Sequence, residues 1–194
     1  MEIVKHPSPT ERSQAGDWWP RARARLGWLP TLGWNYLLGR ILKVRHWWDR
    51  VDERVIVGAY PFARDVPALA ALGVRGVVNT CAEYPGPVAA YQQWGIEQFW
   101  MPTIDFTHPH LADVQEAVEF IERFVRRGET VYIHCKAGRA RSATVALCWL
   151  VKYRGMSVEA AQRQLLEKRP HVNPHLGERP VVRQFIAALA QLDS

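Results

Sequence analysis

A cysteine and an arginine separated by five residues mark the part of this sequence best suited to chemistry. Residues 131–142 read as a short apolar strand, a compact loop from Cys135 to Arg141, and the start of an apolar helix. Such a loop can direct its backbone N–H groups at one centre, and the following helix adds the positive end of its dipole. The same field that binds a phosphate dianion lowers the pKa of a thiol. The pattern therefore predicts a phosphate-binding loop that carries a cysteine nucleophile.

The residues around this cysteine have separate roles in that interpretation. Cys135 attacks phosphorus to form a phosphocysteine, while Arg141 grips two phosphoryl oxygens with its planar guanidinium. Ser142 donates a hydrogen bond to the departing sulfur. We expect the side chain of His134 to order the loop through hydrogen bonds, and Gly138 to permit a turn that a Cβ would obstruct. The residues expected to line the phosphate site are His134, Lys136, Ala137, Gly138, Arg139 and Ala140.

The general acid should be a carboxylic acid on a loop that reaches the leaving group. Asp105 follows the end of a predicted strand, and loops after strand C-termini converge on one site in open α/β sheets. It would protonate the leaving group and then activate the attacking water. The alternatives are that Asp105 is only a solvated loop residue, or that Asp113, within a predicted helix, is the acid. This chemistry uses no metal and no cofactor, and we expect none.

The order of strand, His-Cys, glycine, Arg-Ser and apolar helix resembles the dual-specificity branch of the cysteine-dependent protein tyrosine phosphatase superfamily. A narrower likeness, over about residues 45–190, is to the mitochondrial-type dual-specificity phosphatases that dephosphorylate phosphatidylglycerophosphate. The matching stretches are residues 47–53, 55–62, 83–84, 103–105 and 134–144. The resemblance implies that Cys135, Arg141 and Asp105 are the catalytic residues and that the substrate is an anionic phospholipid.

The same family has an acidic loop beside its pocket, and this sequence keeps only part of it. Glu83 and Tyr84 match that loop, whereas Ala82 and Pro85 stand where the family has acidic residues. The resemblance implies that Glu83 and Tyr84 contact the substrate.

Leaving-group chemistry bears on the choice of substrate. A phenol has a pKa of about 10, whereas an alkyl alcohol is closer to the value for bulk water, about 15.7, so a lipid phosphomonoester depends more strongly on Asp105. Lys136 and Arg139 suit a substrate with a second anionic group. The alternatives are a phosphoprotein phosphatase acting on Tyr or Ser/Thr, a phosphoinositide phosphatase, an RNA 5′-phosphatase, and a pseudophosphatase that only binds phosphate.

The basic character of the chain is concentrated near its N-terminus. The net charge is +6, and residues 1–50 hold nine Lys/Arg against four Asp/Glu together with six of the nine tryptophans. One face of an amphipathic helix is predicted by the apolar residues Trp34, Leu37, Leu38, Ile41 and Leu42. We expect residues 1–46 to be a segment that lies on an anionic membrane surface, and residues 47–194 to be the catalytic domain. The alternative is that this helix packs on the catalytic domain; nucleic acid is not the expected partner.

The cysteines and the apolar segments indicate where the protein works. Cys81, Cys135 and Cys148 show no paired spacing, which favours a reducing compartment. We interpret Cys81 and Cys148 as packing residues; a redox partnership of Cys81 with Cys135 is the alternative. The apolar run at residues 26–42 is shorter than the roughly 20 residues that a membrane-spanning helix needs. The expected location is therefore a membrane surface facing a reducing compartment, on the cytoplasmic side in a bacterium or in a mitochondrion.

Alternating strand and helix signals predict an α/β fold, in which a central, mostly parallel sheet is flanked by helices. The expected strands are residues 54–57, 74–80, 96–101 and 130–134. The expected helices are residues 67–72, 111–125, 142–153, 157–169 and 180–192.

Overall fold

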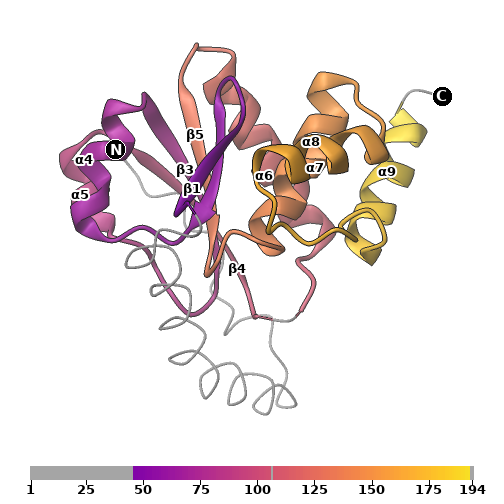
Figure 1. Ribbon diagram of the computed structural model, residues 1–194, viewed down its shortest axis with the longest axis horizontal. Coiled ribbons are helices and arrows are strands. Elements are labelled where there is room, and N and C mark those ends of the chain that lie inside the picture. The colour runs from indigo at the N-terminus through magenta and orange to yellow at the C-terminus, as the bar shows by residue number, and fades with distance from the viewer. Residues whose placement is uncertain (1–45, 106, 193–194) are drawn as a thin grey trace.

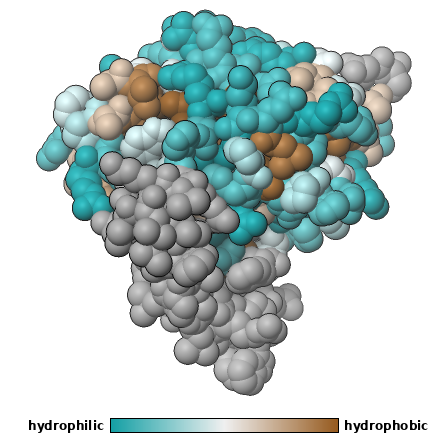
Figure 2. Space-filling view, viewed as in Figure 1, coloured by the Kyte–Doolittle hydropathy of each residue, from teal (hydrophilic) through white to brown (hydrophobic). Residues whose placement is uncertain are grey.

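The computed structural model describes residues 46–105 and 107–192 (Figure 1). The amphipathic helix predicted between Trp34 and Leu42 lies outside the described residues, as does nearly all of the predicted membrane-binding segment. No helix in the described part of the chain is long and apolar enough to span a bilayer. On the face drawn in Figure 2, hydrophilic residues cover most of the described surface and hydrophobic residues form small separate patches.

A five-stranded sheet organises the described part of the chain, with strand order β1-β2-β5-β3-β4. The strands β2, β5, β3 and β4 run parallel, and β1 joins the edge antiparallel to β2. The predicted mostly parallel sheet is thereby confirmed. The strand bounds are β1 (Trp48–Asp52), β2 (Val55–Ala59), β3 (Val74–Cys81), β4 (Glu97–Thr103) and β5 (Thr130–Cys135).

Helices cover both faces of this sheet (Figure 1). The helix bounds are α4 (Val66–Ala71), α5 (Val88–Gln93), α6 (Leu111–Val125), α7 (Arg141–Arg154), α8 (Val158–Lys168) and α9 (Pro180–Leu192). A short 3-10 turn, Ala63–Asp65, precedes α4. Helices α4 and α5 lie on one face, and α6, α7 and α9 lie on the other.

Alternation along the strands supplies the two apolar layers. In β2, Val55 and Val57 belong to the core under α6 and α7, whereas Ile56 belongs to the core under α4 and α5. Successive side chains of a strand point to opposite faces, so a strand covered on both sides is apolar throughout. This is why the buried strands were recognisable from unbroken apolar runs.

Helix ends follow local signals in the sequence. The Ser157 hydroxyl accepts a hydrogen bond from the Ala160 N–H at 3.2 Å, which caps α8 as expected for serine at this position. Gly155 ends α7 in the left-handed conformation, with φ of 61°. Helix α7 is buried over its first ten residues, as its apolar composition predicted.

Two elements were missed by the sequence interpretation. Strand β1 is a short edge strand rich in charged residues, and α5 is a six-residue helix after Pro87. Neither is long enough to show a clear period, and β1 exists because the exposed edge of β2 gives it a partner.

The carboxyl ends of the parallel strands meet at one edge of the sheet. Ala59 of β2 lies in register with Cys135 of β5, and Cys81 of β3 with Thr103 of β4. The segments that leave these four strand ends therefore converge, and every catalytic candidate lies on one of them.

Candidate active site

The loop after β5 encloses the sulfur of Cys135. Strand β5 ends at this residue and α7 begins at Arg141, so residues 136–140 form the whole turn. The sulfur accepts hydrogen bonds from the Gly138 N–H at 3.2 Å and from the Ser142 hydroxyl at 3.3 Å. Burial alone raises the pKa of this thiol, but the charge of Arg141 and the hydrogen bonds outweigh it and hold the pKa below its usual value. The site favours a thiolate.

Gly138 allows the loop to turn against strand β2. Its φ is 66°, a conformation that L-residues with a side chain rarely adopt. A Cβ at this position would lie 2.5 Å from the Gly58 carbonyl carbon and 2.6 Å from the Arg169 Nη2. The predicted need for glycine here is confirmed, and its reason is close packing from two sides.

Arg141 is buried, with 3% of its surface exposed, and is held by three partners. Its two terminal nitrogens donate to the two carboxylate oxygens of Glu83 at 2.9 and 2.8 Å, and Nη1 also donates to the Thr103 carbonyl at 2.8 Å. Nη2 lies 3.2 Å from the Asp105 carboxylate. These contacts hold the guanidinium in place. Burial alone lowers the pKa of Arg141, but the Glu83 hydrogen bonds and the nearby cysteines outweigh it and raise this pKa, so the side chain is charged.

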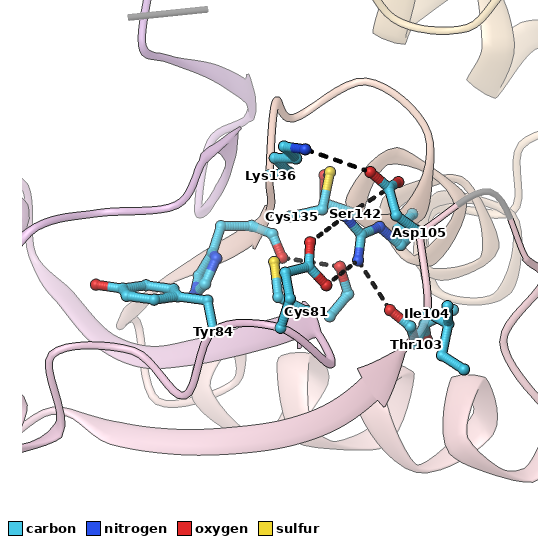
Figure 3. A network of polar contacts seen from close by, with 12 residues as sticks. Cys81, Tyr84, Thr103, Ile104, Asp105, Cys135, Lys136 and Ser142 are labelled. Carbon is cyan, nitrogen blue, oxygen red and sulfur yellow. Dashed lines mark hydrogen bonds and ion pairs between the residues drawn. The ribbon is translucent and has the colours of Figure 1, made fainter. Parts of the chain in front are cut away.

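Asp105 reaches the same centre from the segment after β4. Its carboxylate lies 3.9 Å from the Lys136 Nζ as well as 3.2 Å from Arg141, and Figure 3 shows it facing the cysteine loop. Its side chain is 21% exposed, so water and a leaving group can reach it. Asp113, the other candidate acid, lies in the first turn of α6. The structure thus brings Asp105 to the nucleophile.

The two further cations of the loop differ in position. Lys136 is buried beside Asp105, whereas Arg139 is exposed and donates its Nε–H to the His171 carbonyl at 2.9 Å. Burial lowers the pKa of Lys136, and the charge of Asp105 partly offsets this effect. Ala137 and Ala140 are half-buried members of the loop and contribute backbone only.

The expectation that the His134 side chain orders the loop through hydrogen bonds is wrong. Neither ring nitrogen has a hydrogen-bond partner among the described residues. The ring is fully buried and stacks on Tyr132, with ring centroids 5.7 Å apart. Burial, together with the charge of Arg141, lowers the pKa of His134 to about 3, so the ring is neutral and acts through packing.

Glu83 and Tyr84 follow β3 and take different positions. Glu83 reaches the phosphate site through its pair with Arg141. Tyr84 packs against Tyr60, with ring centroids 4.5 Å apart, and donates its hydroxyl to the Pro61 carbonyl at 2.6 Å. Burial raises the pKa of Tyr84 to about 12, so this phenol stays protonated.

The other two cysteines are buried in the fold. Burial raises the pKa of both the Cys81 and the Cys148 thiol, in contrast to Cys135. Both thiols are therefore protonated at neutral pH, which fits their interpretation as packing residues.

Two arginines that the sequence interpretation did not include border the site. Arg169 ends α8 and donates to loop carbonyls, and Arg179 precedes α9 and donates to the Thr107 carbonyl at 3.0 Å and to the His108 ring at 3.2 Å. Both lie in the connection between α8 and α9. No spacing or periodicity marks them, because they reach the site only through the tertiary fold.

Comparison with known proteins gives a consistent set of matches. The family profile for the dual specificity phosphatase catalytic domain matches residues 55–186. The Arabidopsis thaliana phosphatidylglycerophosphate phosphatase PTPMT2 is 39% identical over 84% of this chain and 73% of its own. The Homo sapiens phosphatidylglycerophosphatase and protein-tyrosine phosphatase 1 is 33% identical over 84% of this chain and 85% of its own. The crystal structure of PTPMT1 in complex with PI(5)P superposes with a TM-score of 0.70 at 30% identity, covering 77% of this chain and all of that one.

Proposed function

This chain belongs to the dual-specificity phosphatase family and is a cysteine-dependent phosphatase, and on that premise we propose that it hydrolyses phosphatidylglycerophosphate to phosphatidylglycerol. The observation that supports this reaction best is the thiol of Cys135, which accepts two hydrogen bonds inside a loop that also holds a buried arginine. The names of two similar proteins, from Arabidopsis thaliana and Homo sapiens, support the substrate.

In the first step, the Cys135 thiolate attacks the terminal phosphorus and the bond from phosphorus to the ester oxygen breaks. Arg141 and the loop N–H groups bind the phosphoryl oxygens, whose charge they balance. Asp105 gives its proton to the departing alkoxide, which leaves as the lipid alcohol. The products of this step are phosphatidylglycerol, a phosphocysteine and an ionised Asp105.

In the second step, Asp105 takes a proton from water and the resulting hydroxide attacks the phosphocysteine. The sulfur–phosphorus bond breaks, inorganic phosphate leaves, and the thiolate is regenerated. The Ser142 hydroxyl, 3.3 Å from the sulfur, stabilises the charge that returns to it. Asp105 regains its proton, so the cycle closes.

The charge around the pocket supports a substrate with a second anionic group. The Lys136 Nζ lies 3.9 Å from the Asp105 carboxylate, and Arg139 lies exposed on the same loop. We assign the phosphodiester of phosphatidylglycerophosphate to this positive region. The two neighbouring cations would neutralise part of its charge.

A phosphoinositide is the second candidate substrate, because the similar PTPMT1 structure holds PI(5)P. Phosphotyrosine is the third, since one similar protein is also named a protein-tyrosine phosphatase.

The experiment is phosphate release from phosphatidylglycerophosphate, phosphoinositides and a phosphotyrosine peptide, each with wild type and Cys135→Ser. We expect the highest kcat/KM on phosphatidylglycerophosphate and no turnover by Cys135→Ser. Turnover of the peptide alone would exclude a lipid substrate.

We also propose that the predicted helix at residues 34–42 holds the enzyme on an anionic membrane surface. The basis is its apolar face and the adjoining cations in the sequence. In the full chain, Leu37→Glu with Ile41→Glu should abolish co-sedimentation with phosphatidylglycerol vesicles and leave hydrolysis of a soluble aryl phosphate unchanged. Unchanged co-sedimentation would contradict the membrane assignment and favour a helix that packs on the catalytic domain.

A further inference from the structure

A buried arginine binds two backbone carbonyls of the phosphate loop. Arg169 is the residue that follows Lys168 at the end of helix α8, and it is 1% exposed. Its Nη2 donates to the Ala137 carbonyl at 3.1 Å and its Nε donates to the Gly138 carbonyl at 2.8 Å. A fully buried arginine that donates to backbone carbonyls is uncommon, because desolvation of its charge costs free energy.

The geometry of the peptide unit shows what these bonds do. The Ala137 carbonyl and the Gly138 N–H belong to one peptide unit, and in a trans peptide they point in opposite directions. Arg169 holds the carbonyl end, while the N–H end donates to the Cys135 sulfur at 3.2 Å. In the next unit, Arg169 holds the Gly138 carbonyl, so the Arg139 N–H points toward the phosphate site.

The segment after Arg169 continues the same pattern. The Asn173 N–H donates to the Arg139 carbonyl at 2.9 Å, and the Arg139 Nε–H donates to the His171 carbonyl at 2.9 Å. Three successive loop carbonyls, at residues 137–139, are thus turned away from the phosphate site by donors from residues 169–173. If one of these units rotated, a carbonyl oxygen would face the phosphate in place of an N–H.

Asp49 anchors the arginine from the other side. Its carboxylate pairs with the Arg169 Nη1 at 2.5 Å, and Asp49 lies on β1, the edge strand. The charge of the guanidinium is therefore balanced without using a group of the phosphate site. This accounts for part of the 47–53 stretch, which the proposed mechanism leaves without a role.

We infer that Arg169, anchored by Asp49, is a positioning residue that aims the N–H groups of the phosphate loop at the sulfur and the substrate. It does not touch the substrate; it acts through the loop backbone. Its five N–H donors in a fixed plane allow it to bind two loop carbonyls, the His46 carbonyl and one carboxylate together, which a lysine cannot do.

The test is Arg169→Lys, which keeps the charge and loses the geometry. The readouts are the denaturation midpoint, kcat/KM on an aryl phosphate, the inhibition constant of inorganic phosphate, and the pKa of Cys135 from the pH dependence of its alkylation by iodoacetamide. We expect kcat/KM to fall about 10- to 100-fold, phosphate to bind several-fold more weakly, and the thiol pKa to rise by about one unit. Asp49→Glu, which keeps every charge but displaces the anchor, should change the same quantities in the same direction by about 3- to 10-fold.

A second ion pair from the same strand provides the control. Asp52, also on β1, pairs with Arg154 at the end of α7, at 3.1 Å, and neither residue contacts the phosphate loop. Arg154→Lys should lower the denaturation midpoint and leave the thiol pKa and phosphate binding at wild-type values. The inference is overturned if folded Arg169→Lys keeps the wild-type thiol pKa and kcat/KM, or if Arg154→Lys changes them equally. If Arg169→Lys does not fold, Asp49→Glu decides by the same criteria.

Discussion

The floor of the active site, residues 135–142, and the loop that carries Asp105 are held in different ways. Cys135 is 4% exposed and Arg141 3%, and the loop around them is hydrogen-bonded on its inner side to the sulfur and on its outer side to Arg169. Asp105 is 21% exposed, and the contacts described for its carboxylate are with Arg141 and Lys136, two side chains of the floor.

This difference in exposure fits the two steps that the regions serve, which are binding of the phosphate and proton transfer to the leaving group. The floor must stabilise a thiolate and a phosphate dianion, and an electrostatic site works best when its dipoles are already oriented before the reaction. A group that serves as the acid must meet the leaving alcohol and then a water molecule at the same place, so it has to remain accessible. Changes in the floor should therefore alter anion binding and thiol chemistry, whereas changes in the Asp105 loop should alter mainly the leaving-group step.

The largest effect is expected from Cys135→Ser, which removes the nucleophile from the floor. We expect kcat to fall at least about 10³-fold on every substrate, since a neutral hydroxyl is a far weaker nucleophile than a thiolate. Steady-state phosphate release measures this. Cys81→Ala, which removes a buried and protonated thiol, should keep activity within about 3-fold. Comparable losses in both variants would contradict the assignment of one nucleophile.

Arg141→Lys should be the next most damaging change in the floor. Lysine keeps the charge but cannot bind two phosphoryl oxygens as a planar fork, and it leaves Glu83 with an imperfect partner. We expect kcat/KM to fall about 100-fold or more and the inhibition constant of inorganic phosphate to rise at least about 10-fold. Wild-type phosphate affinity would show that the loop N–H groups alone bind the anion.

Asp105→Asn tests the more exposed of the two regions, the loop that carries the candidate acid. We expect a loss of about 10²-fold on an aryl phosphate and a larger loss on an alkyl phosphate, because the poorer leaving group needs the proton more. The pKa of Cys135, measured by alkylation, should change far less than kcat. Asp113→Asn, in the first turn of α6, is the control and should stay near wild type. Equal losses on both substrates would argue against Asp105 as the acid.

Ser142→Ala tests how the floor stabilises the thiolate, through the pH dependence of Cys135 alkylation. The hydroxyl bond and the charge of Arg141 lower the pKa of Cys135 in the folded protein, so the thiolate persists at pH values below the usual thiol pKa. Without the hydroxyl, this pKa should rise, and the alkylation rate at low pH should fall while the rate at high pH is unchanged. We also expect kcat to fall about 10-fold, with a burst of alcohol release, because departure of sulfur becomes slower. An unshifted alkylation profile would remove Ser142 from this role.

The smallest effect is expected from Arg179→Gln, which changes a contact of the loop that carries Asp105. Arg179 binds the Thr107 carbonyl and the His108 ring, two and three residues after the acid. Loss of these bonds should lower kcat about 3-fold on an alkyl phosphate and leave phosphate inhibition unchanged. Arg183→Gln, one turn further along α9, is the control and should have no effect. A change in phosphate inhibition would place Arg179 with the floor instead.

Local patterns in the sequence were sufficient for most of the fold. Apolar runs identified β2 and β5, because strands covered on both faces need apolar residues throughout, and β-branched residues identified β3. The serine at residue 157 marked the start of α8, because its hydroxyl caps a free N–H. The edge strand β1 and the short helix α5 were not predicted, since their formation depends on neighbouring elements and not on a hydrophobic period in their own sequences.

The candidate site also contains some features that the local sequence predicts and others that depend on packing. The turn from Cys135 to Arg141 is made of consecutive residues, so its chemistry was readable from their types and spacing. The role expected for His134 was wrong because burial leaves its ring without hydrogen-bond partners, and burial is a property of the packed fold.

By itself, then, the amino-acid sequence determined the cysteine loop, the choice of Asp105 after β4 as the candidate acid, and the alternation of strands and helices that predicts a parallel sheet, because each of these rests on neighbouring residues. Only the tertiary structure decided that Glu83 pairs with Arg141, and that Arg169 and Asp49, 120 residues apart, hold the loop from behind. Contacts of this kind depend on which strand and helix ends meet in space. A spacing pattern along one chain carries no record of them.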